Sequence, residues 1–158
     1  MRKFEKISLE EFHKNYSTDK DIYYNNLVMP KRGSKYSAGY DIATPWDVEL
    51  PAKTTVIFPS LLKVSMEDDE VVLIDVRSSL GFKHNVRLSN TIGVIDKDYY
   101  NNPTNEGHIF IKLYNPTENN IHFNEGERIA QAIFVKYLTT DDDTANEERV
   151  GGIGSTNK

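Results

Sequence analysis

The chain has 158 residues, which is enough for one domain with a buried core that needs neither disulfides nor a structural metal. Its 24 Asp and Glu residues outnumber its 19 Lys and Arg residues, which argues against the basic face of a general phosphate-backbone binder, so we expect no nucleic-acid partner. Cysteine is absent, which excludes disulfides and thiolate metal sites, and a charged N-terminus without long apolar runs predicts a cytoplasmic protein with no membrane association.

Residues 1–26 are predicted to form an N-terminal extension with one short helix that packs on the domain. Ser8 and Glu11 have the spacing of a capping box, in which each side chain bonds the backbone amide of the other residue. Residues 21–29 are rich in Tyr, Ile, Leu and Val and end before Pro30, a pattern that is typical of a strand.

Residues 27–140 have the pattern of antiparallel β-strands. Between residues 46 and 66, apolar residues alternate with polar ones in short segments around Pro51 and Pro59. The run 71–74 is apolar at every position, so both faces of this strand are expected to be buried between two sheets. Further strands are expected at residues 108–114, 120–123 and 129–137. We therefore predict one all-β domain over these residues.

Residues 89–99, with the sequence SNTIGVIDKDY, form the most informative stretch. Polar turn residues lead into a short apolar run, and Asp96, Asp98 and Tyr99 then follow in close succession. We interpret the stretch as a hairpin that presents a carboxylate. Gly93 interrupts a β-branched run, which indicates a bulge or the close approach of another group, such as a ligand. An ordinary hairpin with solvated aspartates is the alternative at this point.

A second candidate site follows the strand at 71–74, where Arg77, Ser78 and Ser79 come in succession. A guanidinium cannot lose its charge, so it requires an anionic partner, and the hydroxyls and backbone amides add donors. That partner is either a bound anion or a structural carboxylate such as Asp41. Both alternatives remain open from the residues alone.

Residues 141–158 form a polar, glycine-rich C-terminal tail that is expected to be flexible in the free protein. One interpretation is a disordered tail. The other is a set of phosphate donors, because the glycines stand beside Arg149 and Ser155. The four histidines show no metal-ligand spacing.

Taken together, five ordered segments resemble the motifs of the homotrimeric dUTP diphosphatases, or dUTPases. These segments are AGYD at 38–41, RSSLG at 77–81, residues 90–99, GERIAQ at 126–131 and GGIGST at 151–156. The resemblance implies an all-β, jelly-roll-like dUTPase fold with a short N-terminal helix added. It also implies a homotrimer with active sites at subunit boundaries, and Mg²⁺-assisted hydrolysis of dUTP to dUMP and pyrophosphate.

The resemblance also implies roles for individual residues. Asp96 would hold and deprotonate the water that attacks the α-phosphorus, and Asp41 would touch the hydration shell of Mg²⁺. Tyr99 would lie below the deoxyribose and leave no room for a 2′-hydroxyl. The implied substrate-binding residues are Arg77, Ser78, Ser79, Asn90, Gly93, Ile95, Tyr99, Gln131, Arg149, Ile153, Gly154 and Ser155.

Four features depart from the family's usual pattern. Ser79 stands where Gly is usual, Ile153 stands where an aromatic residue commonly covers the uracil, and Arg149 lies closer to the glycines than in many members. Residues 100–107 are longer than the usual short turn, and they could bind a protein partner or only extend the surface.

Two other functions remain open from the sequence. A dUTPase fold could serve as a nucleotide sensor or a protein-binding module, because a fold does not determine a function. The related dCTP deaminases would need a glutamate placed to activate water against the base, and we find no clear candidate at the matching position.

Overall fold

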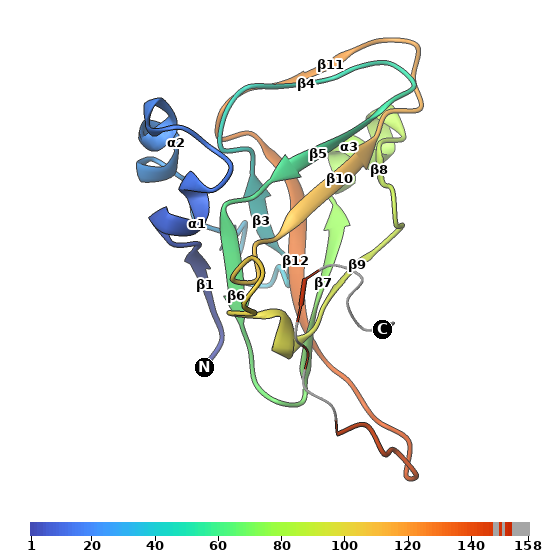
Figure 1. Ribbon diagram of the computed structural model, residues 1–158. Coiled ribbons are helices and arrows are strands. Elements are labelled where there is room, and N and C mark those ends of the chain that lie inside the picture. The colour runs from blue at the N-terminus through green and yellow to red at the C-terminus, as the bar shows by residue number, and fades with distance from the viewer. Residues whose placement is uncertain (147–148, 150, 153–158) are drawn as a thin grey trace.

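The computed structural model describes residues 1–146, 149, 151 and 152. Most of its elements are strands (Figure 1), so the prediction of an all-β domain is confirmed. The largest sheet has five antiparallel strands in the order β2-β3-β12-β7-β9. Their bounds are Lys31–Arg32 for β2, Tyr40–Ala43 for β3, Arg128–Lys136 for β12, Glu70–Val76 for β7 and Gly93–Ile95 for β9.

A second sheet has three strands in the order β5-β10-β8, and two further pairs, β4 with β11 and β1 with β6, complete the sheets. The bounds are Thr55–Pro59 for β5, Phe110–Tyr114 for β10, Arg87–Leu88 for β8, Val48–Leu50 for β4, Ile121–Phe123 for β11, Lys3–Lys6 for β1 and Leu62–Ser65 for β6. Most pairings join strands that are far apart in the sequence, so the whole chain must fold before the sheets are complete.

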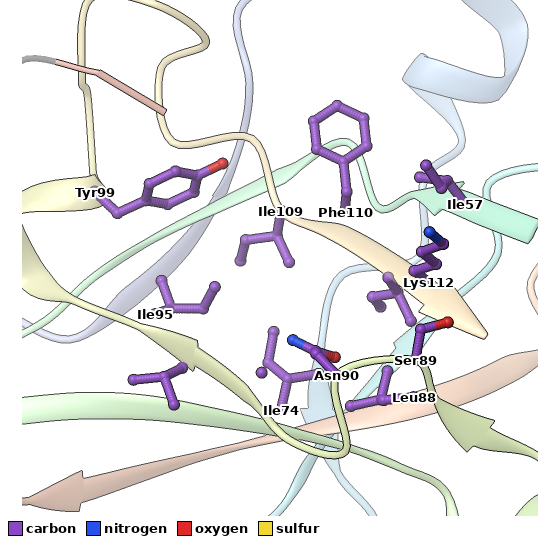
Figure 2. A pocket seen from close by; sticks show the side chains of 13 residues that line it. Ile57, Ile74, Leu88, Ser89, Asn90, Ile95, Tyr99, Ile109, Phe110 and Lys112 are labelled. Atoms are coloured by element: carbon purple, nitrogen blue, oxygen red, sulfur yellow. The ribbon is translucent and has the colours of Figure 1, made fainter. Parts of the chain in front are cut away.

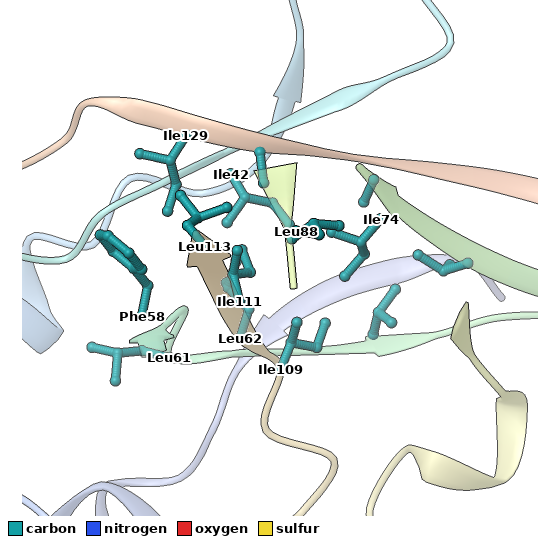
Figure 3. Close-up of a cluster of buried hydrophobic side chains, with 14 of the residues drawn as sticks. Ile42, Phe58, Leu61, Leu62, Ile74, Leu88, Ile109, Ile111, Leu113 and Ile129 are labelled. Atoms are coloured by element: carbon teal, nitrogen blue, oxygen red, sulfur yellow. The ribbon is translucent and has the colours of Figure 1, made fainter. Parts of the chain in front are cut away.

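The core lies between the two larger sheets (Figure 3). Ile42, Ile74 and Ile129 come from the five-stranded sheet, and they meet Ile111 and Leu113 from β10. Each of these side chains is at most 2% exposed. Burial of one such side chain contributes roughly 1.5–3 kcal/mol, so this cluster holds the two sheets together.

The predicted burial of both faces of β7 is wrong for the single chain. Val72 and Ile74 are buried, whereas Val71 and Leu73 are only half-buried. The strand therefore alternates, because only one face of its sheet packs on the core. An apolar run alone could not distinguish this arrangement from a strand between two layers.

The N-terminal segment contains three helical turns. They are α1 (Leu9–His13), the 3₁₀ helix η1 (Thr18–Lys20) and α2 (Asp21–Asn25). The predicted strand at 21–29 is therefore wrong. Lys6 Nζ donates to the carbonyl of Tyr24 at 2.7 Å, and the Tyr24 hydroxyl donates to the carbonyl of Ile7 at 2.6 Å. These tertiary contacts outweigh the β propensity of the segment.

Half of the predicted capping box is present. Ser8 Oγ accepts a hydrogen bond from the Glu11 amide at 3.0 Å, as predicted. The Ser8 amide, however, donates to Glu106 Oε2 at 3.0 Å, while the Glu11 carboxylate pairs with Lys14. A carboxylate that is distant in the sequence has taken the place of the local partner.

The first 26 residues contribute to the common core. Ile7 and Phe12 are 0% exposed and belong to the same buried cluster as the β-sheets. The division of the chain near residues 26 and 140 remains a prediction. None of the helices in the described part of the chain has the length and apolar character that crossing a membrane requires.

Candidate active site

Residues 89–99 cross from one sheet to the other. Strand β8 before them pairs with β10, and strand β9 within them pairs with β7. The predicted hairpin is therefore wrong, because its two arms belong to different sheets. The crossing leaves an opening between the edges of the sheets, and the polar turn lies at its rim (Figure 2).

This opening is a pocket of about 370 Å³, a volume typical of small-ligand sites. Four predicted substrate-binding residues line it: Asn90, Gly93, Ile95 and Tyr99. The other lining residues are Ile57, Ile74, Leu88, Ser89, Val94, Ile109, Phe110, Ile111 and Lys112. The walls are therefore mostly apolar, with a few polar groups that could orient a ligand.

The feature that explains Gly93 is its neighbour on β7. A Cβ atom at position 93 would lie 3.2 Å from Cβ of Ile74, which is tighter than an ordinary contact. The register from Val72 opposite Ile95 to Ile74 opposite Gly93 is continuous, so the predicted bulge is wrong. The predicted close approach is real, and the approaching group is the side chain of Ile74.

Tyr99 ends the 3₁₀ helix η2 (Lys97–Tyr99) and is 6% exposed. Its hydroxyl donates to the carbonyl of His108 at 2.8 Å and accepts from Asn105 Nδ2 at 2.9 Å. Burial raises the pKa of the Tyr99 phenol, so it stays protonated at neutral pH. Asn105 was not predicted as a site residue, although its place in the long segment after Tyr99 was the available signal.

Asp96 and Asp98 lie beside the pocket and share one cation. Arg149 Nη2 donates to Asp96 Oδ2 at 2.7 Å, and Arg149 Nε donates to Asp98 Oδ1 at 2.9 Å. The guanidinium carbon lies 5.8 Å from the centre of the Tyr99 ring. The Arg149 side chain is 11% exposed, whereas those of Asp96 and Asp98 are about half exposed. Arg149, the predicted phosphate-binding arginine, thus forms an ion pair with Asp96, the predicted catalytic carboxylate.

The second group of predicted residues surrounds Asp41 on β3. Arg77 Nε lies 3.3 Å from Asp41 Oδ1, and Arg128 Nη1 lies 2.9 Å from Asp41 Oδ2. Gln131 on β12 lies opposite Asp41 on β3 in the sheet register, and it lies opposite Asp75 on β7 on the other side. The structural partner of Arg77 is therefore Asp41. Arg128 was not predicted as a site residue, although it lies within the GERIAQ segment.

Gly39 and the two serines complete this region. A Cβ atom at position 39 would lie 2.4 Å from Gln131 Oε1, so glycine leaves the space that the Gln131 side chain occupies. Ser78 and Ser79 begin helix α3 (Ser78–His84) and are exposed. Exposed hydroxyls and amides at this turn remain accessible to an anion.

The two groups of predicted residues are not bonded to each other in the described part of the chain. No hydrogen bond or ion pair among the described side chains joins the Asp41 group to Asn90, Asp96 or Tyr99. Ile153, Gly154 and Ser155, the remaining predicted residues, lie outside the described part of the chain.

The described residues contain no group of three or more His, Asp or Glu side chains that could hold a metal ion. Each oxygen of Asp41 already has a guanidinium partner, and the carboxylate is 13% exposed. Direct ligation would compete with two cations, whereas a remaining lone pair can accept a hydrogen bond from a metal-bound water. Asp41 therefore fits an indirect role toward a hydrated Mg²⁺ ion.

The fold and the site define a class of protein. An all-β domain with an apolar pocket, an adjacent carboxylate pair and a group rich in arginine has the parts of a phosphoanhydride hydrolase. The pocket can bind an apolar face, a carboxylate can accept a proton, and guanidinium groups can bind phosphate oxygens.

Comparisons with known proteins identify the family. Residues 25–157 match the family model described as dUTPase. The deoxyuridine 5′-triphosphate nucleotidohydrolase of Lactococcus lactis subsp. lactis (strain IL1403) is 43% identical over 132 residues, which are 82% of this chain and 88% of that protein. The protein of the same name from Arabidopsis thaliana is 34% identical over 136 residues, which are 82% of this chain and 76% of that protein.

Solved structures agree with this result. The crystal structure of dUTPase from Streptococcus mutans is 37% identical with a TM-score of 0.71, covering 87% of this chain and 98% of that one. The dUTPase from phage phi11 of S. aureus has a TM-score of 0.68 at 20% identity, covering 93% and 97%, and this likeness concerns the fold alone. The chain belongs to the dUTPase family, and the predicted jelly-roll-like dUTPase fold is confirmed.

Proposed function

We propose that this member of the dUTPase family hydrolyses dUTP to dUMP and pyrophosphate. The observation that carries the proposal is the position of Asn90, Gly93, Ile95 and Tyr99 in one pocket, with Asp96 following directly after Ile95. The pocket receives the uracil and the deoxyribose. The triphosphate then extends past Asp96 toward the arginines and hydroxyls of the second group.

Asp96 is the general base in this proposal. It accepts a proton from a bound water, the water oxygen attacks the α-phosphorus, and the bond from this phosphorus to the bridging oxygen breaks, so that pyrophosphate leaves. A positioned base is typically worth about 10²–10⁴-fold in rate. The charge of a triphosphate repels nucleophiles, so alignment of the water and neutralisation of the phosphates supply the rest.

Arg77, Ser78, Ser79 and Gln131 bind the phosphates. Arg149 Nη2 donates to Asp96 Oδ2 at 2.7 Å, and a guanidinium partner weakens a carboxylate as a base, so release of Arg149 would leave Asp96 better able to take a proton from the attacking water. An incoming triphosphate offers the guanidinium a stronger set of anionic oxygens than two half-exposed carboxylates do. The same arginine would then serve the phosphates, as the sequence predicts, together with Gly154 and Ser155 of the tail, while Ile153 would cover the uracil.

Mg²⁺ is the proposed cofactor, bound mainly by the phosphates, with Asp41 acting through water. When bound, it supplies positive charge to the triphosphate. A structural Mg(II) ion is described for the phage phi11 dUTPase, whose likeness to this chain concerns the fold. We also propose a homotrimer that acts in the cytoplasm. A protein partner for residues 100–107 stays a prediction.

The test is an assay of pyrophosphate release from each common nucleoside triphosphate with Mg²⁺, repeated with EDTA. We expect turnover of dUTP far above that of dTTP, dCTP and UTP, and its loss with EDTA. Release of ammonia from dCTP would instead favour the deaminase alternative. Nucleotide binding without turnover would favour the sensor alternative.

A further inference from the structure

We propose that Asn105, in the segment 100–107, is a positioning residue that holds Tyr99 in place for discrimination between deoxyribose and ribose. This inference rests on the proposed function, in which the Tyr99 ring lies below the sugar. It assigns a role in specificity to a segment that is longer than the usual turn of the family.

The phenol of Tyr99 has two protein partners in a buried position. Its only hydrogen is donated to the carbonyl of His108, and its oxygen accepts from Asn105 Nδ2. Both bonds come from the C-terminal end of the segment 100–107 and the residue after it, Asn105 and His108, so the ring cannot tilt without breaking at least one of them. The phenol also has no hydrogen left to donate to a 2′-hydroxyl on the substrate.

The orientation of the Asn105 amide is set by its other contacts. Asn105 Oδ1 accepts from Asn102 Nδ2 at 2.8 Å and from the Gly107 amide at 3.1 Å. With both donors on the oxygen, the nitrogen is the end that faces Tyr99. Asn102 is 4% exposed, and its side chain also donates to the carbonyl of Tyr99 at 2.8 Å.

The loop is held tightly against Tyr99 and the N-terminal segment. Gly107 has φ +82°, and a Cβ atom there would lie 2.5 Å from the Tyr99 carbonyl oxygen, so only glycine lets the chain return this closely. Glu106 accepts from the Ser8 amide and hydroxyl and from Lys63 Nζ. Asn105 is therefore presented by a rigid support on both sides.

The rigidity of the Tyr99 ring matters because a deformable pocket can move to admit the extra 2′-hydroxyl of UTP. An apolar pocket rejects such an analogue only about 10²-fold. A ring that cannot move adds a steric clash, and the buried hydroxyl of ribose would find no donor on the phenol. Loosening Tyr99 should therefore favour UTP relative to dUTP.

Asn105→Asp isolates this contact. The carboxylate keeps an oxygen for Asn102 and Gly107, but it has no hydrogen to donate to Tyr99. Its other oxygen can only compete with the His108 carbonyl for the single phenol hydrogen, so the phenol keeps one of its two bonds at most. The matched control is Asn101→Asp, which makes the same charge change in the same loop. Asn101 Oδ1 accepts from Lys63, its backbone φ is +56°, which Asp tolerates, and its side chain makes no bond to Tyr99.

The measurement is the ratio of kcat/KM for dUTP to kcat/KM for UTP. We expect Asn105→Asp to lower this ratio about 10-fold, whereas Asn101→Asp should leave it near the wild-type value. A double-mutant cycle that combines Asn105→Asp with Tyr99→Phe tests whether Asn105 acts through the phenol. In the Tyr99→Phe background, Asn105→Asp should change the ratio by less than about 2-fold, because its partner oxygen is absent.

The outcomes are distinct. If wild type hydrolyses dUTP but Asn105→Asp keeps the ratio of the control, or if its effect simply adds to that of Tyr99→Phe, the inference is wrong and the proposed function stands. A wild-type chain that does not hydrolyse dUTP overturns both. If Asn105→Asp does not fold, Asn105→Ser replaces it in the same cycle, since a serine hydroxyl is too short to reach Tyr99.

Discussion

Asp96 and Asp98 are difficult to tell apart by ion pairing alone. Arg149 contacts Asp96 at 2.7 Å and Asp98 at 2.9 Å, and their exposures are 52% and 51%. What separates them is position along the chain. Each adjoins a residue that lines the pocket, Ile95 and Tyr99 respectively, but Asp96 is the extended residue between β9 and η2, whereas Asp98 lies within the 3₁₀ helix η2.

We therefore expect Asp96→Asn to bind dUTP almost as wild type does but to lose about 10²–10⁴-fold in turnover, because an amide can hydrogen-bond water but cannot take its proton. Calorimetric titration with a non-hydrolysable dUTP analogue and steady-state kinetics would measure the two effects. Asp98→Asn is the matched control, since each variant removes the charge of one of the two carboxylates that Arg149 contacts. If Asp98→Asn is the severe variant, the two roles are exchanged.

Among individual residues, the sequence indicated those whose chemistry is visible in a motif. The carboxylates and Arg77 were singled out because charged residues directly follow apolar runs, whereas the role of Tyr99 came from the resemblance to the dUTPases. Asn105 and Arg128 were not predicted as site residues. Their importance depends on which atoms face them, Tyr99 Oη and Asp41 Oδ2 respectively, and no local pattern encodes such a pairing.

Among the elements, the N-terminal helix α1 is connected to the segment 100–107 through Ser8. Ser8 Oγ accepts from the Glu11 amide as an N-cap and also donates to Glu106, and the Ser8 amide donates to the same carboxylate. The segment that begins the chain thus stabilises the loop that holds Tyr99.

Ser8→Ala should lower the free energy of unfolding by about 1–2 kcal/mol, through loss of the cap and of a hydrogen bond to a charged acceptor. Thermal unfolding followed by circular dichroism would detect this as a drop of several degrees in Tm. Ser17→Ala is the control, because Ser17 precedes η1 without making a side-chain cap bond. Equal effects of the two substitutions would contradict the role of Ser8.

The type of an element was predictable where apolar and polar residues alternate regularly. The prediction failed where tertiary contacts determine the secondary structure. The strands at 55–59, 62–65 and 110–114 follow their apolar pattern. The helix α2 and the crossing at 89–99 do not, because each depends on partners elsewhere in the chain. A short apolar run between turns does not say which sheet it will join.

For the molecule as a whole, two titratable groups make the free energy of unfolding depend on pH: the buried His108 imidazole and the hydrogen-bonded Glu106 carboxylate. Burial lowers the pKa of His108 to about 4, although the charge of Glu106 opposes this shift. For Glu106, burial alone would raise the pKa, but Ser8 and Lys63 together lower it to about 2. Each group has a folded-state pKa below its unfolded value, so each contributes stability that is lost as pH falls.

The His108 contribution is complete above its unfolded pKa of about 6.5 and disappears as pH approaches 4, while that of Glu106 is lost between about 4.5 and 2. We expect the free energy of unfolding to fall by about 2 kcal/mol between pH 7 and pH 5 from His108 alone. Urea unfolding at both pH values would measure it. In His108→Gln, which keeps an acceptor for the Leu61 amide, most of this difference should vanish.

The arrangement of the two residue groups leads to a prediction about assembly. Within one chain, the pocket with Asp96 and the group around Asp41 and Arg77 share no hydrogen bond or ion pair among their described side chains, yet the proposed reaction needs both on one triphosphate. A cyclic trimer would solve this problem by placing the Arg77 group of one subunit against the pocket of the next.

Subunit mixing tests this arrangement directly. Asp96→Asn and Arg77→Gln should each be nearly inactive when refolded alone, but a one-to-one mixture refolded together should regain about a quarter of wild-type turnover, because random assortment gives each boundary a one-in-four chance of two intact halves. Light scattering should give three times the chain mass. The control mixture is Asp96→Asn with Asn90→Ala, whose defects lie in the same pocket, and which should regain no activity. No recovery in the first mixture although mixed trimers form, or full activity in a monomer, would show that each chain completes its own site.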